Sequence, residues 1–196
     1  MDRATTVKGA ARPAEQDAKS AEQNASQAEQ DFVHQLELDY PEVKFVWGRP
    51  RFSYRLKNGV PTVFLGEPQP NFGLLALHEL GHALCGHKDY KVDVQRIKIE
   101  SEAWERAKTV YGDYVKRLQK NEAAAGGNLS DNEIGDGGQS LSVILPEWDE
   151  DFVQEKLDTY RDWLHAKSRC KKCGLTRYQT ENGEYHCPRC ENFARS

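Results

Sequence analysis

The segment FGLLALHELGHALC, residues 72–85, decides how this chain is interpreted. Apart from its two histidines and one glutamate it is apolar around nearly its whole circumference, which predicts a buried helix. On that helix His78 and His82 lie one turn apart on the same face, so both imidazoles can bind one metal ion. Glu79 projects about a quarter-turn round, near the open coordination position of that metal. Burying three such side chains without a partner is costly, and a metal ion supplies one.

The pattern HELGH in residues 78–82 is typical of zinc metallopeptidases, in which the glutamate acts as a general base. In this interpretation Glu79 takes a proton from zinc-bound water and later delivers it to the leaving amine. The zinc ion lowers the pKa of the water and polarises the scissile carbonyl. We therefore expect an enzyme that hydrolyses peptide bonds of an intracellular protein or peptide substrate. A catalytic zinc usually has three protein ligands, so one more is needed.

Three downstream residues are candidates for the third ligand: His87, Glu100 and Glu102. His87 would point away from the first histidine if the motif helix continued, and it misses the metzincin spacing. A second helix is predicted over residues 97–118, and its apolar stripe centres where Glu100 projects, whereas Glu102 falls on the charged side. A metal explains a carboxylate in a core-facing stripe, so Glu100 is the predicted ligand. The alternative is a salt bridge at the start of the helix.

The HELGH segment and the following Glu-Ser-Glu-Ala at residues 100–103 resemble the ImmA/IrrE-type metallopeptidases and, more broadly, the gluzincins. The gluzincin third ligand is the glutamate of a Glu-x-x-Ser/Ala-Asp pattern, which corresponds to Glu100. The resemblance covers roughly residues 43–118 and implies a small sheet packed on the motif helix and the glutamate helix. Some members of this family cleave repressor-type regulators. Trp104 stands where gluzincins often have Asp or Asn, so the partner of a zinc histidine must come from elsewhere.

The residues before the motif helix predict a small antiparallel sheet. Residues 43–47 and 51–56 have strand-like patterns, and the Asn-Gly pair at 58–59 predicts a hairpin turn into a return strand over residues 60–65. Pro61 predicts that the return strand lies at a sheet edge or a bulge. The expected fold class is α+β: this sheet packed on the HExxH helix and the glutamate-bearing helix, with a further helix and a zinc ribbon after them.

Four of the five cysteines form two CxxC pairs separated by thirteen residues. With a hairpin turn between them, such pairs predict a zinc ribbon, a closed structural site without catalytic function. About thirty residues cannot bury a stable core, so the metal is expected to supply the folding energy. The cofactors are thus one catalytic and one structural Zn²⁺. The ligands of the structural zinc would be Cys170, Cys173, Cys187 and Cys190.

The role of the ribbon stays open from the sequence. Residues 165–196 carry seven Lys/Arg against three Asp/Glu, which is compatible with a structural role, a partner protein or nucleic acid. The whole chain has a net charge of -4, so no global basic field indicates nucleic acid or a membrane. No apolar run is long enough to span a membrane, and no secretory h-region precedes residue 31. The odd number of cysteines and their CxxC spacing favour a reducing compartment, so the sequence predicts a cytoplasmic protein.

Composition divides the chain into five parts. Residues 1–30 have almost no large apolar side chain, which predicts a disordered tail, and residues 121–141 are rich in Gly, Asn and acidic residues, which predicts a flexible acidic linker. The remaining parts are a metallopeptidase domain over 31–120, a helix over 142–166 opened by Pro146, and the zinc ribbon over 167–196.

Two other functions are compatible with parts of this sequence. An SprT-like DNA-associated protease also joins HExxH to a C-terminal zinc ribbon, but it would need a third histidine well downstream of His82. A non-catalytic zinc-binding interaction module would have no use for Glu79 as a general base. The oxyanion-stabilising residue is left unassigned among Tyr90, Tyr111 and His87.

Overall fold

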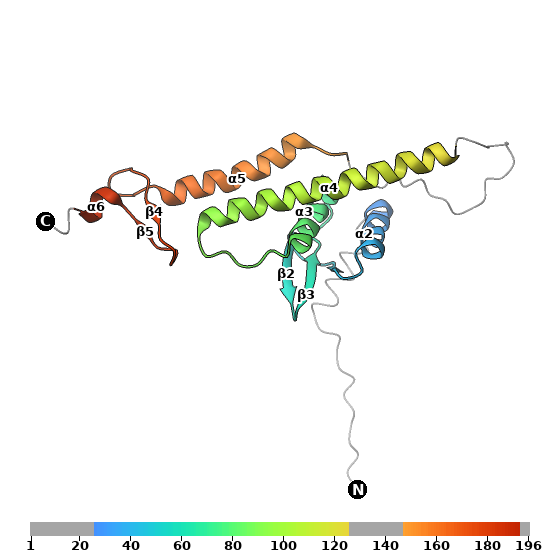
Figure 1. Cartoon of the computed structure of the whole chain (residues 1–196), viewed down its shortest axis with the longest axis horizontal. Coiled ribbons are helices and arrows are strands. Elements are labelled where there is room, and N and C mark those ends of the chain that lie inside the picture. Colours follow the sequence, from blue (N-terminus) through green and yellow to red (C-terminus); the bar gives the residue numbers. More distant parts are fainter. Residues whose placement is uncertain (1–25, 126–146, 193–196) are drawn as a thin grey trace, which may run out of the picture.

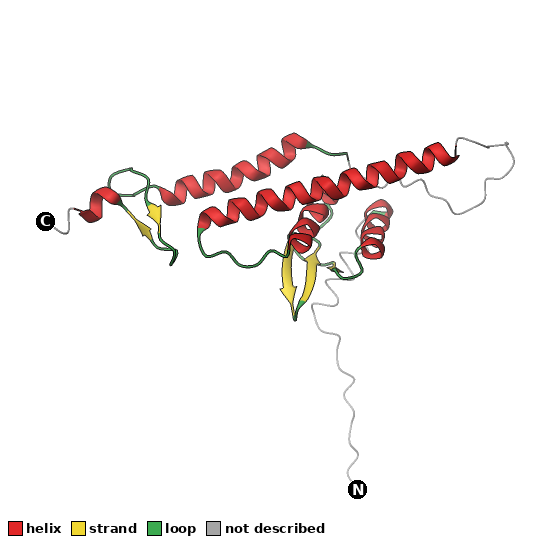
Figure 2. Cartoon of the chain, viewed as in Figure 1, coloured by secondary structure: helices red, strands yellow, loops and turns green. Residues whose placement is uncertain are grey.

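The computed structural model describes residues 26–125 and 147–192 of the chain. Figure 1 shows the long helix α4 with α5 lying along one side of it and helix α3, the three-stranded sheet and α2 on the other. A small hairpin and helix α6 lie at the end of α5 (Figure 2). The elements in chain order are α2 (Gln27–Asp39), β1 (Lys44–Val46), β2 (Ser53–Lys57), β3 (Val60–Phe64), α3 (Phe72–Cys85), α4 (Asp93–Ala125), α5 (Glu150–Ser168), β4 (Tyr178–Gln179), β5 (Tyr185–His186) and α6 (Pro188–Asn192).

Helix α2 begins within residues 1–30, for which the composition predicts a disordered tail. The Ser26 hydroxyl accepts a hydrogen bond from the backbone N–H of Glu29, and the Glu29 carboxylate accepts one from the backbone N–H of Ser26. This capping box satisfies two donors that a helix start otherwise leaves unpaired. Three apolar residues of α2 are buried in the core, so packing adds to the local signal. Residues 27–30 are therefore helical, and residues 1–25 lie outside the described part.

The sheet is mixed, with strand order β1-β3-β2. β2 and β3 form the expected hairpin, whose turn holds Asn58 and Gly59 at φ 52° and 80°. The expectation of a wholly antiparallel sheet was wrong for β1, which pairs parallel with β3. β3 lies between the other two strands because it buries three consecutive residues, more than either neighbour.

Pro61 therefore lies in a central strand, and its predicted place at a sheet edge was wrong. The register explains how a central strand tolerates it. β1 begins at Lys44, opposite Thr62, so Pro61 lies one residue beyond the end of β1 and pairs only with Leu56 of β2. No ladder bond on the β1 side requires the N–H that proline lacks.

Helix α3 has the predicted bounds and is buried between the sheet and α4. The α+β class is confirmed, with the sheet packed on α3 and α4 packed on the other side of that helix. α4 is longer than the predicted 97–118 and extends into the expected linker, whose residues 126–141 lie outside the described part. α5 begins at Glu150, with the Asp149 carboxylate accepting from the backbone N–H of Phe152, and not near Pro146. No helix among the described residues is both long and apolar enough to cross a membrane.

Gly81 sets how closely α3 and α4 approach. A Cβ atom at this position would lie 2.2 Å from the carbonyl oxygen of Ala103, a distance that real atoms do not tolerate. The obstacle is backbone and not a flexible side chain, so it cannot move aside. The contact lies one residue before His82 on α3 and three residues after Glu100 on α4. The absence of a side chain at Gly81 therefore brings the two ligand-bearing helices together.

We expect Gly81→Ala to lower the free energy of unfolding by about 1–3 kcal/mol, because the added methyl group forces α3 and α4 apart. Gly112→Ala is the matched control, since it is also a helical glycine but no atom lies within 4 Å of its added Cβ. That control should stabilise the protein by about 0.4–1 kcal/mol. Urea denaturation measures both effects. Equal stability of Gly81→Ala and the wild type would contradict the close helix contact.

Candidate metal centre

Helices α3 and α4 bring three buried ligand-type side chains to one point. His78 and His82 come from α3 and Glu100 from α4, and each is less than a tenth exposed. The Nε2 atoms of the two histidines lie 3.2 Å apart. Glu100 Oε2 lies 3.1 Å from His78 Nε2 and 3.4 Å from His82 Nε2. The chain therefore contains a His₂Glu group that can hold a metal ion.

The spacing of the three atoms fits a tetrahedral ion. Zinc bound at about 2.0–2.1 Å in a tetrahedron separates neighbouring ligand atoms by about 3.3 Å. The three measured separations lie on both sides of that value. Three protein ligands also leave one coordination position open, as in catalytic zinc sites. The donor set and its geometry therefore fit a catalytic zinc ion.

The protonation states suit metal binding as well. Burial lowers the pKa of His78 to about 4, so its imidazole is neutral near pH 7. Burial alone would raise the pKa of Glu100, but its contacts with His78 and His82 outweigh this and hold the pKa well below its ordinary value. A neutral imidazole and an ionised carboxylate are the forms that bind metal ions. The nearest full positive charge in the described part of the chain is the Arg96 guanidinium, whose Nε lies 3.8 Å from Oε1 of Glu100, so a bound cation would balance the buried carboxylate better.

Glu79 adjoins this group and has an unusual acidity. Burial raises the pKa of its carboxyl group to about 7, an effect that the negative charge of Glu100 strengthens. Nearby His82 and a hydrogen bond from the backbone of Tyr54 act in the opposite direction without cancelling it. A carboxyl group with a pKa near the working pH can both accept and donate a proton.

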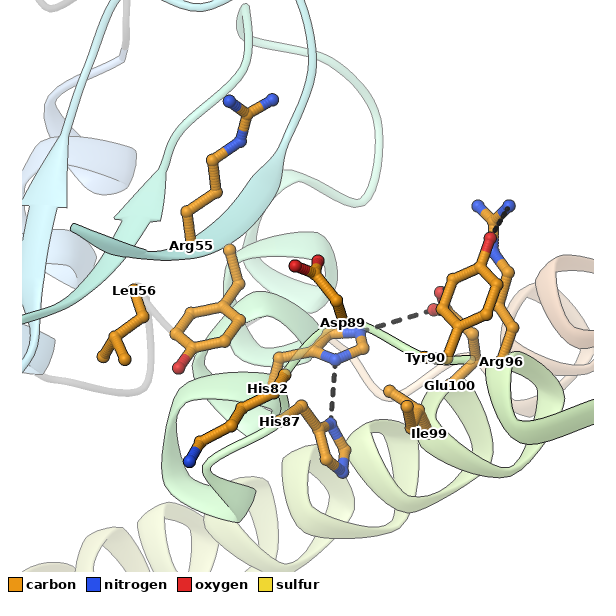
Figure 3. A pocket seen from close by; sticks show the side chains of 11 residues that line it. Arg55, Leu56, His82, His87, Asp89, Tyr90, Arg96, Ile99 and Glu100 are labelled. Atoms are coloured by element: carbon orange, nitrogen blue, oxygen red, sulfur yellow. Dashed lines mark hydrogen bonds and ion pairs between the residues drawn. The ribbon is translucent and has the colours of Figure 1, made fainter. Parts of the chain in front are cut away.

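A pocket of about 640 Å³ opens onto the metal-ligand group (Figure 3). His82 and Glu100 lie in its wall, and strand β2 forms one side through Tyr54 and Leu56. The loop after α3 lines another part of the pocket, which places Tyr90, an expected oxyanion candidate, in its wall. The candidate metal site is thus reachable by a molecule in solution.

Tyr160 of α5 belongs to the site, and sequence reasoning missed it. Its side chain lies near Glu100, and burial together with that carboxylate raises the pKa of the phenol. The rings of Tyr160 and Trp163 also pack on the guanidinium of Arg96, at 4.9 and 5.1 Å. In the sequence Tyr160 fits the apolar stripe of its helix, so only the packing of α5 against α4 reveals its place beside Glu100.

The helical projection used against His87 does not apply, because α3 ends at Cys85, as predicted. Gly86 adopts φ 64° and ends the helix, and the chain turns back so that the His87 backbone N–H donates to the His82 carbonyl. Nδ1 of His87 then lies 2.9 Å from Nδ1 of His82, on the side of the ring away from the metal-facing Nε2. Glu102, the other excluded candidate, contacts His87 at 3.3 Å.

The four paired cysteines form a second candidate metal site. The Sγ atoms of Cys170 and Cys190 lie 3.9 Å apart, and those of Cys173 and Cys187 lie 3.5 Å apart. Tetrahedral zinc with bonds of about 2.3 Å would separate its sulfur ligands by about 3.8 Å. Backbone N–H groups of Cys173 and Lys172 lower the pKa of the Cys170 thiol to about 6, which favours the thiolate form. The strands β4 and β5 form the predicted hairpin between the two pairs.

A comparison with protein-family models, curated proteins and solved structures finds no match for this chain. The two ligand groups and their surroundings are therefore the basis for assigning a function.

We expect native mass spectrometry to find two zinc ions per wild-type chain and one in Glu100→Ala, because two imidazoles alone make a weak site. Glu105→Ala is the matched control: it removes an exposed carboxylate from the same helix and should retain both ions. A Glu100→Ala protein that keeps two zinc ions would exclude Glu100 as a ligand.

Proposed function

We propose that this chain is a zinc-dependent peptidase of the gluzincin kind, similar to the ImmA/IrrE-type enzymes. His78, His82 and Glu100 would hold the catalytic zinc, and Glu79 would act as general base and acid. The observation that carries the proposal is the buried His₂Glu group with zinc-like spacing and a pocket beside it. Three protein ligands would leave one position of a tetrahedral ion open.

Glu79 supplies the proton transfers that peptide hydrolysis needs. A zinc ion at a His₂Glu site polarises a carbonyl group and lowers the pKa of water. Glu79 accepts the proton of the attacking water and then donates it to the nitrogen of the leaving amine. Its pKa of about 7 supports both steps, since neither its protonated nor its ionised form is strongly favoured near neutral pH.

Strand β2 offers a place for an extended peptide beside the site. It is an edge strand, and its residues Tyr54, Arg55 and Leu56 line the pocket beside His82 and Glu100. Backbone polar groups alternate in direction along a strand, so every second residue of an edge strand points its N–H and C=O away from the neighbouring strand. An extended substrate can pair with that edge, and the main chain would then run past the metal site. This arrangement favours a peptide bond as the reacting group.

The two alternative functions have less support. For an SprT-like protease a histidine would replace Glu100 as third ligand, but the nearest further histidine, His87, contacts the far nitrogen of His82. A purely structural zinc site would need no open coordination position. It would also have no use for Glu79, whose raised pKa indicates that withdrawing its carboxylate from water costs free energy. The partners of the enzyme would be a protein or peptide substrate and, through the ribbon, a partner protein or nucleic acid.

Replacing the general base separates catalysis from metal binding. We expect Glu79→Gln to reduce cleavage of a fluorescence-quenched peptide library by at least about 100-fold while keeping both zinc ions. The amide has nearly the shape of the carboxylic acid, so the fold is retained. Glu105→Gln, on an exposed surface of α4, is the control and should cleave at the wild-type rate. Wild-type activity in Glu79→Gln would rule out this mechanism.

A further inference from the structure

The first inference concerns the ring nitrogen of His82 that faces away from the ligand group. Nδ1 of His82 lies 2.9 Å from Nδ1 of His87, and Nε2 of His87 lies 3.3 Å from Oε2 of Glu102 (Figure 3 shows the contact between the histidines). We propose that His87 and Glu102 form a relay that positions the metal ligand His82. The inference rests on the proposed metal site and adds two residues to it.

Only one arrangement of protons on the uncharged rings satisfies this chain of contacts. A neutral His82 that binds metal through Nε2 carries its proton on Nδ1, so Nδ1 is a donor. His87 must then accept with Nδ1, which leaves its own proton on Nε2. That N–H donates to the Glu102 carboxylate, which can only accept. The direction of every bond follows from metal binding at Nε2 of His82.

Local structure holds the relay in place. The left-handed conformation of Gly86 turns the chain back at the end of α3, and this puts His87 beside His82. The His87 side chain is only 9% exposed, and Glu102 is paired with Lys98 at 3.6 Å. A fixed imidazole between a metal ligand and a carboxylate orients that ligand and raises its basicity.

The relay supplies what Trp104 does not. The sequence has this tryptophan where a polar partner for a zinc histidine was expected. In the structure the Trp104 ring stacks on His78 at 4.2 Å between centroids, and Nδ1 of His78 is buried with no hydrogen-bond partner among the described residues. The two histidine ligands are therefore oriented in different ways: His78 by stacking on an aromatic ring, and His82 by the relay.

The relay is tested by zinc affinity, measured by competition with a chromophoric chelator, for His87→Leu and His87→Gln. We expect His87→Leu to weaken the His₂Glu site about 10- to 100-fold. His87→Gln should restore most of the affinity, because its amide oxygen can accept from Nδ1–H of His82. His34→Leu, at a histidine that is 70% exposed, is the control and should bind like the wild type. Glu100→Ala gives the baseline of the cysteine site alone.

The absorption spectrum of the Co²⁺-substituted protein provides a second readout that a folding defect would not mimic. His87→Leu should shift the visible bands of the His₂Glu site and leave the thiolate bands of the cysteine site unchanged. Unchanged affinity and spectrum in His87→Leu would overturn the relay while the metal site stands. If His87→Leu lost the ion and Glu100→Ala kept it, His87 would be a ligand and the relay would also fail. A wild type with zinc only at the cysteines would instead overturn the proposed function.

A second inference comes from an independent observation at the start of α4. The backbone N–H of Asp93 donates to Oε1 of Gln179 at 2.7 Å. The Asp93 carboxylate accepts from the Tyr185 hydroxyl at 2.7 Å and pairs with Nζ of Lys167 at 2.7 Å. Gln179 lies in β4 and Tyr185 in β5, which are the two strands of the hairpin between the cysteine pairs. The ribbon thus caps the first turn of the helix that carries Glu100.

This contact links the two candidate metal sites. The first N–H groups of a helix need acceptors from outside the helix, and without them the first turn frays. Here one acceptor belongs to the zinc ribbon. The ribbon has only about thirty residues, so its fold depends on metal binding by its four cysteines. Glu100 follows Asp93 by seven residues, or about two turns. We infer that metal binding by the cysteines stabilises the start of α4 and thereby the position of Glu100.

Two variants of different severity test this link. Tyr185→Phe removes one hydrogen bond to Asp93 and leaves the ribbon cysteines intact, whereas Cys170→Ser/Cys173→Ser removes the ribbon metal. We expect both to speed amide hydrogen exchange over residues 93–100 and to weaken zinc binding at the His₂Glu site, by about 2- to 30-fold. Tyr178→Phe, on the exposed tyrosine of β4, is the control and should change neither. Unchanged exchange and unchanged affinity in the double variant would overturn the link.

Discussion

Two imidazoles and a carboxylate meet in the interior of this protein, between two helices that approach closely at Gly81. Removing such groups from water costs several kcal/mol unless each finds a compensating partner. His78, His82 and Glu100 partly compensate one another, but a carboxylate and two neutral rings with their lone pairs facing one point are best balanced by a cation. The packing of α3 on α4 holds these three side chains in place, and the sheet and α5 enclose the two helices.

The surroundings of the ligand group support the proposed peptidase function. A half-buried carboxyl group with a pKa of about 7, that of Glu79, lies on the same helix as both histidines. The edge strand β2 and the loop after α3 form a pocket that leads to the ligands. Tyr160 reaches Glu100 from α5, so even the helix that leads to the ribbon contributes to the site. A structural ion would require none of these features, whereas a hydrolytic one requires a base, access and firmly held ligands.

Much of this could be predicted from sequence, where local chemistry decides the structure. The apolar run around HELGH defines α3 to the residue, Asn58 and Gly59 define the hairpin, and helical periodicity selects Glu100 over Glu102. The start of α2 could also have been found, because Ser26 and Glu29 form a capping-box pattern that composition alone hides.

Other features depend on contacts between distant segments and leave little trace in the sequence. The parallel pairing of β1 joins two strands that are separated by β2 in the sequence, and no turn residue signals it. Tyr160 resembles an ordinary core residue until α5 is packed against α4. The contact between His87 and His82 does have a sequence signal, because Gly86 can end a helix in the left-handed conformation and reverse the chain. The sequence argument considered His87 only for a helix that continues past that glycine, and so it did not predict the contact between His87 and His82.

The central claim is most directly tested by a crystal structure of the zinc-loaded protein with anomalous diffraction at the zinc edge. The account predicts two anomalous peaks per chain. One should lie about 2.0–2.2 Å from His78 Nε2, His82 Nε2 and Glu100 Oε2, and the other should lie among the four cysteine sulfurs. A single peak at the cysteines, with His78, His82 and Glu100 in direct contact and no metal between them, would contradict it.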